Sequence, residues 1–482
     1  MNIRIAERHW ETVRRLTSLS FVKGLWFPPE TGCILLLGLS DHPRAQSLLV
    51  SAVLAPEQGD FADQESGALT FTSRYLRKAL IAVRERGLAG FLTVHTHPGS
   101  DRQVGFSSYD DQNDPSLMEN LHELEPQANF GSMVLGKRSA CARLWRDNVP
   151  QYLNEFIIVG EQLTFLNLNG REEAAPPTAS DIFDRSLALT GPGALARVSR
   201  ARIAIVGLSG TGSLIAELLM RAGAGELVLF EFDPADRTNL GRVLHLRSSD
   251  ADSAVNKAQR IAQVVAESGL PTKVTIVPCG DIRDPAVAAE LRGCDLLIGC
   301  VDRDWPRLIL SEVSYQYLIP LIDLGTEIGA SGAEIQSLDA RVSFVGPGRP
   351  CLFCSRVITQ ERIRLESYHA AEQERVLAMG YSKDIRLTTP AVMDLNMRAA
   401  SLAGLFVRHL YQPFLEIPLP HTVRETVTNF SPKRQRFAPG EGCIVCNCPE
   451  RLGSGERYRL STRASNPDLS SLLEIGASGA PE

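Results

Sequence analysis

The chain has 482 residues, of which 44% are hydrophobic and 22% charged, and its formal net charge is -6. This length exceeds what one ordinary core holds, so we expect two or three domains of a soluble globular protein. The small negative charge gives no reason to expect nucleic acid or an anionic membrane as a partner. No apolar run reaches the roughly 18 residues of a membrane span, and the N-terminus lacks a signal peptide's apolar region. We therefore expect a cytoplasmic protein, whose ten cysteines are thiols or metal ligands.

Residues 1–170 are expected to form an α+β unit in which strands predominate. The apolar runs that predict strands are Cys33–Leu39, Ser47–Leu54, Gly90–Val94, Ser132–Leu135 and Phe156–Ile158. A helix is predicted at Ser73–Arg86. Residues 171–180 combine charged residues and alanines with a Pro-Pro pair, which predicts a linker.

From residue 181 to residue 449 the pattern alternates strand, turn and helix, which predicts a doubly wound parallel α/β sheet of the Rossmann type. The predicted strands are Arg202–Val206, Glu226–Glu231, Lys273–Val277 and Asp295–Val301, and the predicted helices are Ser213–Ala222, Ala254–Ser268 and Pro285–Leu291. Residues 355–380 are predicted as a helical insert, and Thr389–Leu410 as a long helix with Pro390 in its first turn. Residues 450–482 are rich in Ser, Gly, Arg and Ala, and we expect a mostly disordered tail.

A first candidate site contains His95 and His97, which alternate on one predicted strand and so point to the same face. Two imidazoles and the carboxylate of Asp110 would leave a zinc position open for water. Zinc lowers the pKa of such a water, and a carboxylate must then take its proton. Glu30 is the candidate base, and Ser107 is a candidate hydrogen-bond donor to the oxyanion.

The residues Glu30…Gly38, His95-Thr96-His97-Pro98 and Ser107-x-x-Asp110 resemble the JAB/JAMM metallopeptidases. That family includes deubiquitinases and prokaryotic enzymes that trim ubiquitin-like proteins, and the resemblance implies a catalytic zinc in residues 1–170. Nine residues separate His97 from Ser107, where seven are commoner, and Glu30 is one residue further from Gly38 than usual. The alternatives are ordinary strand histidines, or a family fold that has lost its activity.

A second candidate site is the turn Gly207-Leu208-Ser209-Gly210-Thr211-Gly212, between a predicted strand and helix. Gly207, Gly210 and Gly212 allow the backbone to approach a phosphate at a helix N-terminus. An NAD-binding Rossmann domain would share this turn, with Glu231 or Asp233 on the ribose.

Other residues indicate adenylation, which needs cations around a triphosphate and a carboxylate for magnesium. The candidate cations are Arg185, Arg242 and Lys257, and the candidate carboxylate is Asp302 at a strand end. Hydride transfer needs none of these residues.

This set, together with Thr238-Asn239-Leu240-Gly241-Arg242, resembles the ThiF/MoeB/E1 superfamily, which activates the C-terminal carboxylate of ubiquitin-like proteins as an acyl-adenylate. The implied roles are ribose binding by Asp233 and magnesium binding by Asp302. Phosphate contacts are implied for Asn239, Arg242 and Lys257, and Ser209 belongs to the glycine turn that binds the nucleotide. Arg185 would reach an active site, often that of a dimer partner, and a homodimer is expected. Glu231 stands where the family usually has Asp and Val243 where it has Gln, and we assign neither to the chemistry.

Two Cys-x-x-Cys pairs, Cys351/Cys354 and Cys443/Cys446, predict a structural zinc with four thiolates and no open position. The resembling family has the same arrangement. A redox dithiol is the competing interpretation, and Cys448 is a neighbour without an assigned role.

Many E1 enzymes pass the modifier to a cysteine shortly before a helix that begins near a proline. The matching residues 379–390 contain no cysteine, and Ser382 stands at that position. The enzyme either stops at the adenylate, forms an oxyester on Ser382, or uses a cysteine elsewhere such as Cys448. A serine is a poor nucleophile without a base, so an ordinary loop serine is the simpler interpretation.

These observations predict a fusion of a JAB-like zinc peptidase with an E1-like adenylating enzyme that uses Mg-ATP. The expected partners are a ubiquitin-like β-grasp protein, which is trimmed or deconjugated and then activated, and an E2-like protein. One alternative is activation for sulfur transfer, with a sulfurtransferase as partner. Another is an NAD-binding module beside an inactive peptidase fold.

Overall fold

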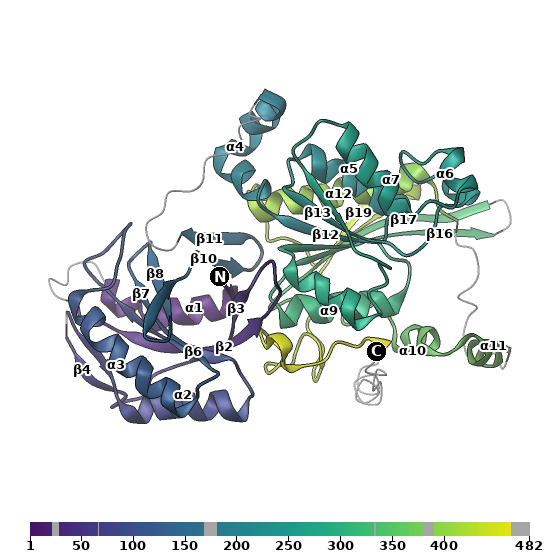
Figure 1. The fold of residues 1–482 in the computed structure, drawn as a ribbon. Coiled ribbons are helices and arrows are strands. Elements are labelled where there is room, and N and C mark those ends of the chain that lie inside the picture. The colour runs from purple at the N-terminus through teal and green to yellow at the C-terminus, as the bar shows by residue number, and fades with distance from the viewer. Residues whose placement is uncertain (22–27, 66, 168–180, 332–333, 379–389, 464–482) are drawn as a thin grey trace. The chain divides into compact units, whose positions relative to one another are not determined.

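The computed structural model describes residues 1–21, 28–65, 67–167, 181–331, 334–378 and 390–463. The chain forms two compact units (Figure 1). The first holds Met1–Glu173, Gln316–Leu318 and Pro449–Tyr458, and the second holds Ala174–Tyr315, Ile319–Cys448 and Arg459–Glu482. The boundary after residue 173 falls in the expected linker, of which residues 171–180 lie outside the described part.

The first unit is built on a nine-stranded mixed sheet with the order β11-β10-β1-β3-β2-β6-β7-β8-β9. Its strands are β1 (Asn2–Ala6), β2 (Gly32–Ser40), β3 (Ser47–Leu54), β6 (Gly90–Thr96), β7 (Asn129–Leu135), β8 (Ala140–Arg146), β9 (Val149–Tyr152), β10 (Glu155–Val159) and β11 (Leu163–Asn167). A separate hairpin joins β4 (Phe61–Gln64) to β5 (Leu69–Phe71). The helices are α1 (Glu7–Leu16), α2 (Ser73–Glu85) and α3 (Ser108–Leu124).

Successive side chains of the central strands enter two different cores, because a strand turns them to opposite faces. Val94 of β6 packs in one core with Val13 of α1. Phe91 of the same strand packs in the other core with Tyr75 of α2 and Met118 of α3. Burial of each such side chain contributes about 1.5–3 kcal/mol, so both layers of helix are held firmly on the sheet.

The second unit is built on an eight-stranded sheet with the order β14-β13-β12-β15-β16-β17-β18-β19. Its strands are β12 (Arg202–Val206), β13 (Glu226–Phe230), β14 (Lys273–Ile276), β15 (Leu296–Gly299), β16 (Leu321–Ser331), β17 (Glu334–Val345), β18 (Thr422–Thr426) and β19 (Ser431–Gln435). Its helices are α4 (Asp184–Val198), α5 (Gly210–Arg221), α6 (Ser248–Asp252), α7 (Lys257–Glu267), α8 (Pro285–Ala289), α9 (Asp304–Gln316), α10 (Gln360–Ser367), α11 (Ala370–Ala378) and α12 (Met393–Tyr411).

The predicted parallel α/β sheet of this unit is confirmed for β12, β13, β14 and β15, and β16, which was not predicted, adds a fifth parallel strand beside β15. β17, β18 and β19, which were not predicted either, extend the sheet by antiparallel pairing. The strand order reverses between β12 and β15, and ligands of doubly wound sheets bind at the carboxyl ends of strands at such a point. Gly207 directly follows β12, and Asp302 follows β15, so both candidates belong to this edge.

The C-terminal segment differs from the disordered tail that we expected, because residues 450–463 are ordered and only 464–482 lie outside the described part. A β-carbon on Gly455 would lie 2.0 Å from the carbonyl oxygen of Leu39 in β2, so residues 449–458 pack closely within the first unit, to which they belong. Ser461 donates from its backbone N–H and its hydroxyl to the buried Glu312 of α9, at 2.7 Å each. These contacts hold residues 450–463 in place although the segment is rich in polar residues. Within the described residues, every helix is too short or too polar to cross a membrane.

Candidate functional site

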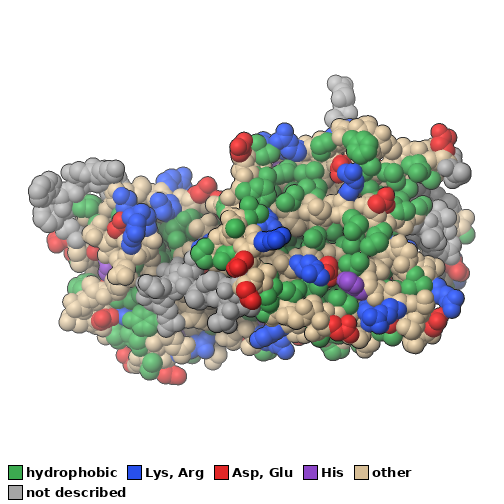
Figure 2. Space-filling model, turned by 90° about the horizontal axis from the view of Figure 1, so that it is seen from above, with side chains coloured by type: hydrophobic (Ala, Val, Ile, Leu, Met, Phe, Trp, Pro, Cys, Tyr) green, Lys and Arg blue, Asp and Glu red, His purple; other side chains and the backbone are tan. Residues whose placement is uncertain are grey.

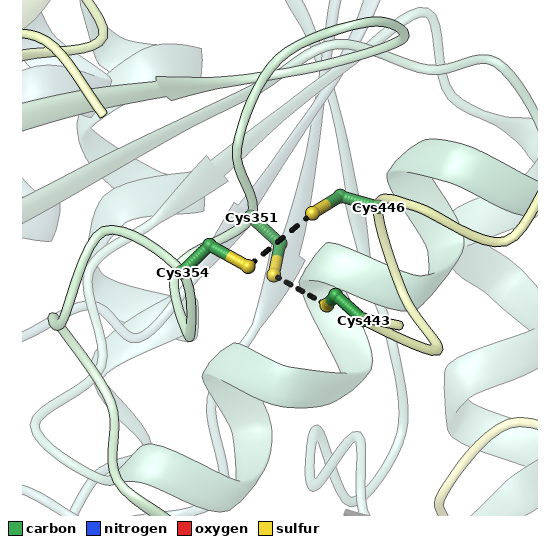
Figure 3. A group of neighbouring side chains, drawn as sticks. All are labelled: Cys351, Cys354, Cys443 and Cys446. Carbon is green, nitrogen blue, oxygen red and sulfur yellow. Dashed lines mark hydrogen bonds between the residues drawn. The ribbon is translucent and has the colours of Figure 1, made fainter. Parts of the chain in front are cut away.

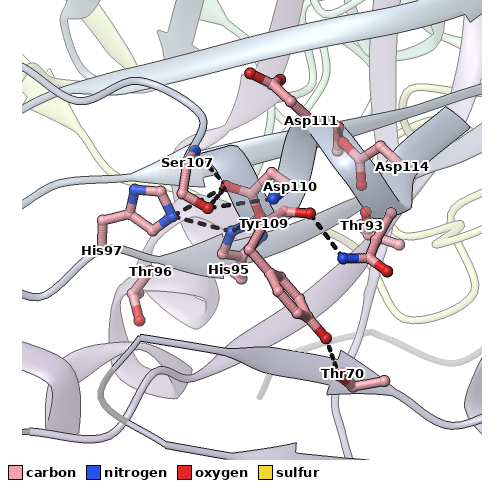
Figure 4. Close-up of polar contacts among 12 residues, drawn as sticks. Thr70, Thr93, His95, Thr96, His97, Ser107, Tyr109, Asp110, Asp111 and Asp114 are labelled. Atoms are coloured by element: carbon pink, nitrogen blue, oxygen red, sulfur yellow. Dashed lines mark hydrogen bonds and ion pairs between the residues drawn. The ribbon is translucent and has the colours of Figure 1, made fainter.

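The pairing of β2 with β6 determines the first candidate site. Gly32 lies opposite His95 in this antiparallel ladder. Because the face alternates along each strand, Glu30, two residues before Gly32, continues on the same face as His95 and His97. One ligand atom from each of these three residues lies within 4.8 Å of the other two. The Nε2 atoms of His95 and His97 are 3.2 Å apart (Figure 4).

Asp110 reaches these histidines from the first turn of α3. Its Oδ1 lies 3.0 Å from His95 Nε2, and its Oδ2 lies 3.4 Å from His97 Nε2. Ser107 caps α3, accepting from the Asp110 N–H at 3.2 Å and donating its own N–H and hydroxyl to Asp110 Oδ2 at 2.6 and 2.8 Å (Figure 4). In this arrangement the Ser107 hydroxyl orients Asp110.

Burial and hydrogen bonding shift the pKa values of Glu30 and Asp110 in opposite directions. Burial raises the pKa of Glu30, whose residue is 4% exposed, as is useful for a general base. Burial also acts to raise the pKa of Asp110, but hydrogen bonds from His95 and His97 outweigh it and hold that pKa well below its usual value. Asp110 is therefore an anion, as a metal ligand must be.

The donor set fits zinc. Two nitrogens on one tetrahedral zinc, with bonds of about 2.0–2.1 Å, lie roughly 3.3 Å apart, close to the 3.2 Å between His95 and His97. A carboxylate oxygen from Asp110 completes three ligands and leaves one position open, as in catalytic zinc sites. Glu30 then lies beside the ligands as a further carboxylate.

The β4–β5 hairpin also shapes this site, although the sequence analysis did not assign it a role. Glu30 donates its backbone N–H to the carbonyl of Glu65 at 2.9 Å, and its carbonyl accepts from the Gln64 amide at 3.1 Å. Tyr109, next to Asp110, hydrogen-bonds through its hydroxyl to Thr70 of β5 at 3.2 Å (Figure 4). The only signal in the sequence is a short polar hairpin, which does not reveal what it packs against.

The second candidate site is the turn between β12 and α5. Gly207 has a φ of +87°, and a β-carbon there would lie 2.7 Å from the carbonyl oxygen of Cys300. α5 starts at Gly210, so the first N–H groups of this helix face the carboxyl edge of the sheet, where a phosphate can accept from them.

Lys257 supplies a buried cation at this turn. Its ammonium lies 3.2 Å from the Ser209 hydroxyl, 3.4 Å from Glu231 and 3.9 Å from Asp233. Glu231 also accepts from the N–H of Leu208 at 2.8 Å and from the N–H of Asp233 at 2.9 Å. Glu231, to which we assigned no chemistry, thus ties the glycine turn to the end of β13. Its position at the end of a strand was the signal in the sequence.

The other predicted residues of this site differ in their surroundings. Asn239 is 4% exposed and bonds to Asp236, with its Oδ1 accepting from the Asp236 N–H at 3.4 Å. Arg242 is half-buried, and its carbonyl oxygen would lie 3.5 Å from a β-carbon on Gly210. Asp302 is exposed, and Arg185 is exposed on α4. Ser382 lies outside the described residues. The long helix begins at Met393 as α12, so the prediction that Pro390 stands in its first turn was wrong: Pro390 precedes the helix, and Val392 at the N-cap position has an extended backbone.

The two Cys-x-x-Cys pairs come together, with all four sulfurs within 4.8 Å of one another (Figure 3). Cys351 Sγ is 3.7 Å from Cys443 Sγ, and Cys354 Sγ is 3.5 Å from Cys446 Sγ. Sulfurs on a tetrahedral zinc with bonds of about 2.3 Å are roughly 3.8 Å apart, so this cluster fits zinc. All ten cysteines are free of disulfides.

A sequence profile described as "ThiF family" matches residues 183–441, which belong to the second unit apart from Gln316–Leu318. The chain is 26% identical over 318 residues to "Ubiquitin-like modifier-activating enzyme 5" of Oryza sativa subsp. japonica, covering 63% of this chain and 69% of that protein. It is 29% identical over 181 residues to "SAMP-activating enzyme E1" of Haloferax volcanii, covering 37% of this chain and 62% of that protein. It is 30% identical over 152 residues to "tRNA threonylcarbamoyladenosine dehydratase" of Escherichia coli, covering 31% and 54%.

Among solved structures, Escherichia coli MccB with ATP has a similar backbone. The similarity covers 56% of this chain and 76% of the MccB chain, with 18% sequence identity and a TM-score of 0.43. The same protein without ligand gives a TM-score of 0.45 at 17% identity, over 56% of this chain and 73% of its own.

Proposed function

Because the chain belongs to the ThiF family, we propose that its second unit activates the C-terminal carboxylate of a ubiquitin-like β-grasp protein with Mg-ATP. In this reaction a carboxylate oxygen of the modifier attacks the α-phosphorus of ATP, an acyl-adenylate forms, and pyrophosphate leaves. The family match carries this proposal, and the buried Lys257 beside the glycine turn supports it.

The role of each candidate residue follows from its charge and its position. The N–H groups at the start of α5, together with Lys257 and Arg242, would hold the phosphates, and Asp233 would hold the ribose. Magnesium, when bound at Asp302, would offset charge on the phosphates. Arg185 of a second subunit would add a further cation.

Pyrophosphate exchange tests this proposal. The full chain is incubated with ATP, labelled pyrophosphate and a β-grasp protein that ends in glycine, and label in ATP is counted. Exchange should depend on the modifier and fall to background in Asp302→Ala. Binding of NAD in preference to ATP, without exchange, would support the alternative of an NAD-binding module.

We also propose that the first unit is a JAB/JAMM-like zinc peptidase that exposes the modifier's C-terminal glycine or cleaves its conjugates. The observation that supports it is that Glu30, His95 and His97 lie together and that Asp110 contacts both histidines. Zinc, when bound, would activate a water and polarise the scissile carbonyl. Glu30 would take a proton and deliver it to the leaving amine, and Ser107 would help to orient Asp110.

A modifier carrying a C-terminal extension tests the peptidase. Mass spectrometry should show loss of the extension with the zinc-loaded chain, and no loss with Glu30→Gln or His95→Ala. An intact extension with every variant and with the unaltered chain would argue for a fold without activity.

We further propose that the chain forms a homodimer through the second unit. Hydrophobic side chains gather on the face of this unit seen in Figure 2, where Figure 1 shows α4, α5 and α12. Leu189 of α4, Leu218 of α5 and Leu405 of α12 are 66%, 41% and 47% exposed, and the same three helices line a cavity of about 210 Å³. Light scattering should give twice the chain mass, and Leu405→Glu should give the single mass.

The fate of the adenylate decides between the remaining alternatives. An E2-like partner would receive the modifier as a thioester, whereas a sulfurtransferase would convert it to a thiocarboxylate. A covalent adduct on this chain that is lost in Ser382→Ala or Cys448→Ser would identify the residue that carries it. An enzyme that stops at the adenylate would show no adduct.

A further inference from the structure

Arg143 of β8 is among the most deeply buried charged residues of the first unit, with a side chain that is 2% exposed. Its guanidinium makes ion pairs with two carboxylates of α3. Nη2 lies 2.8 Å from Asp114 Oδ2, and Nη1 lies 2.5 Å from Asp111 Oδ1. Ser132 of β7 donates its hydroxyl to the same oxygen of Asp114. One buried cation therefore fixes α3 to the sheet at two positions.

The same guanidinium lies against an aromatic ring. Its central carbon is 3.7 Å from the ring centroid of Phe106, and 5.0 Å from that of Trp145. Phe106 is the last residue of the loop that leads from His97 to Ser107, the residue that caps α3. Arg143 thus contacts both segments that meet at Ser107, the loop through Phe106 and the helix through Asp111 and Asp114.

These contacts flank the candidate metal ligand without including it. Asp111 follows Asp110 directly, Asp114 lies one turn further along α3, and Phe106 precedes the cap (Figure 4 shows the three aspartates on one helix). The imidazoles of His95 and His97 come instead from β6 and the residue after it. The distance from Asp110 to the histidines therefore depends on how α3 lies on the sheet, and the ion pairs of Arg143 are among the contacts that hold α3 there.

We propose that Arg143 is a positioning residue for the hydrolytic centre: by clamping α3 and the Phe106 loop, it sets where Asp110 meets His95 and His97. This inference rests on the proposed peptidase function. A guanidinium suits the role because it is planar, offers donors in a fixed fork and stacks on an aromatic face, whereas an ammonium does none of these. Lys at this position would keep the charge and lose the geometry.

The test measures metal binding as well as catalysis. Cobalt(II) replaces zinc in the full chain, and the metal bound at this centre is defined as the part lost in His95→Ala/His97→Ala. Removing Arg143 alone would strand two carboxylates and could unfold the unit. The main variant is therefore Arg143→Met/Asp114→Asn, which removes both charges of the buried pair, with Arg143→Lys and Phe106→Leu as milder changes.

We expect the double variant to fold and to lose about 10-fold in metal affinity, the low end of the range seen when a partner that bonds directly to a metal ligand is removed. The cobalt absorption spectrum should change shape, and kcat should fall more than KM rises. Arg143→Lys should lie between this variant and the unaltered chain. Arg74→Met is the control, because Arg74 of α2, whose side chain is 53% exposed, pairs with the buried Asp60 at 2.7 Å and not with a carboxylate of α3. It should leave affinity and spectrum unchanged.

Two outcomes overturn the inference in distinguishable ways. If the variants melt earlier but keep the metal affinity, the spectrum and kcat of the unaltered chain, Arg143 only stabilises the core. If the unaltered chain binds no metal that depends on His95, the proposed peptidase function fails and the inference fails with it.

Discussion

Gly212 lies against Gly207 so closely that a β-carbon on Gly212 would stand 1.9 Å from the Gly207 carbonyl oxygen. Gly207 in turn approaches Cys300 after β15 and has a left-handed φ of +87°. The glycine turn is therefore packed backbone against backbone between β12, α5 and β15. A side chain at residue 212 would have to push the turn open, away from the position in which its N–H groups converge.

Gly212→Ala should abolish pyrophosphate exchange and lower the free energy of unfolding of the second unit by about 1–3 kcal/mol, as overpacking does. Urea unfolding and ATP binding by calorimetry check the two effects. Gly346→Ala is the control, because a β-carbon there meets only Phe344 at 3.8 Å. Normal ATP binding by Gly212→Ala would show that the phosphate site lies elsewhere.

Lys257 and Glu231 form a buried ion pair, in which each side chain is 4% exposed. Lys257→Met leaves the Glu231 carboxylate without this partner, so we expect a lower melting temperature as well as a loss of about 100-fold or more in kcat/KM for exchange. Lys257→Arg keeps a cation beside Glu231 and should restore most of the melting temperature. If Lys257→Arg also restored exchange, charge alone at this position would be sufficient.

Much of both candidate sites was predictable, because the spacing of residues in the sequence determines where each lies on its strand or turn. The spacing of two between His95 and His97 places them on one face of any strand, and the glycine turn follows a strand that was predicted correctly. Glu30 was the weakest match. What confirms its nearness to the histidines is the register between β2 and β6, in which Gly32 lies opposite His95, far away in the sequence.

Local patterns could not predict α3 or the role of Arg143. The buried residues of α3 recur at helical spacing, but two of the four are aspartates, Asp110 and Asp114, so a search for apolar periodicity finds no helix. Asp114 is buried because Arg143, on a strand that was not predicted, pairs with it. The position of Glu231 at the end of a strand was visible in the sequence, but its hydrogen bond with the Leu208 N–H was not.

The four-cysteine cluster should hold one zinc per chain. Cys351→Ser should remove about one equivalent of zinc, measured by mass spectrometry of the metal, and lower the melting temperature of the second unit. Cys448→Ser is the control, since Cys448 is not among the four clustered sulfurs. Full zinc content in Cys351→Ser, with a disulfide-linked Cys443/Cys446 pair, would favour the redox interpretation.

Asp304 at the start of α9 should make the stability of the second unit depend on pH. Asp304 is fully buried; Oδ2 accepts from the Thr359 N–H at 2.9 Å, and Oδ1 accepts no hydrogen bond among the described residues. Burial raises the pKa of Asp304, and burial likewise raises that of Glu366, whose carboxylate accepts from the N–H groups of Asp304 and Trp305. A folded-state pKa above the unfolded value favours the fold at low pH.

This contribution is lost as the pH rises from the usual value of 3.8 through the raised pKa of Asp304. Asp304→Asn keeps an oxygen for the Thr359 N–H and removes the charge, so it should raise the free energy of unfolding by about 1 kcal/mol at pH 8 and change it little at acid pH. Asp281→Asn is the opposite control: burial acts to raise the pKa of Asp281, but Arg283 outweighs it and lowers that pKa, so this variant should lose stability at pH 8. Urea unfolding at both pH values measures each difference. Destabilisation by Asp304→Asn at pH 8 but not at acid pH would show instead that the Asp304 carboxylate is needed in its charged form.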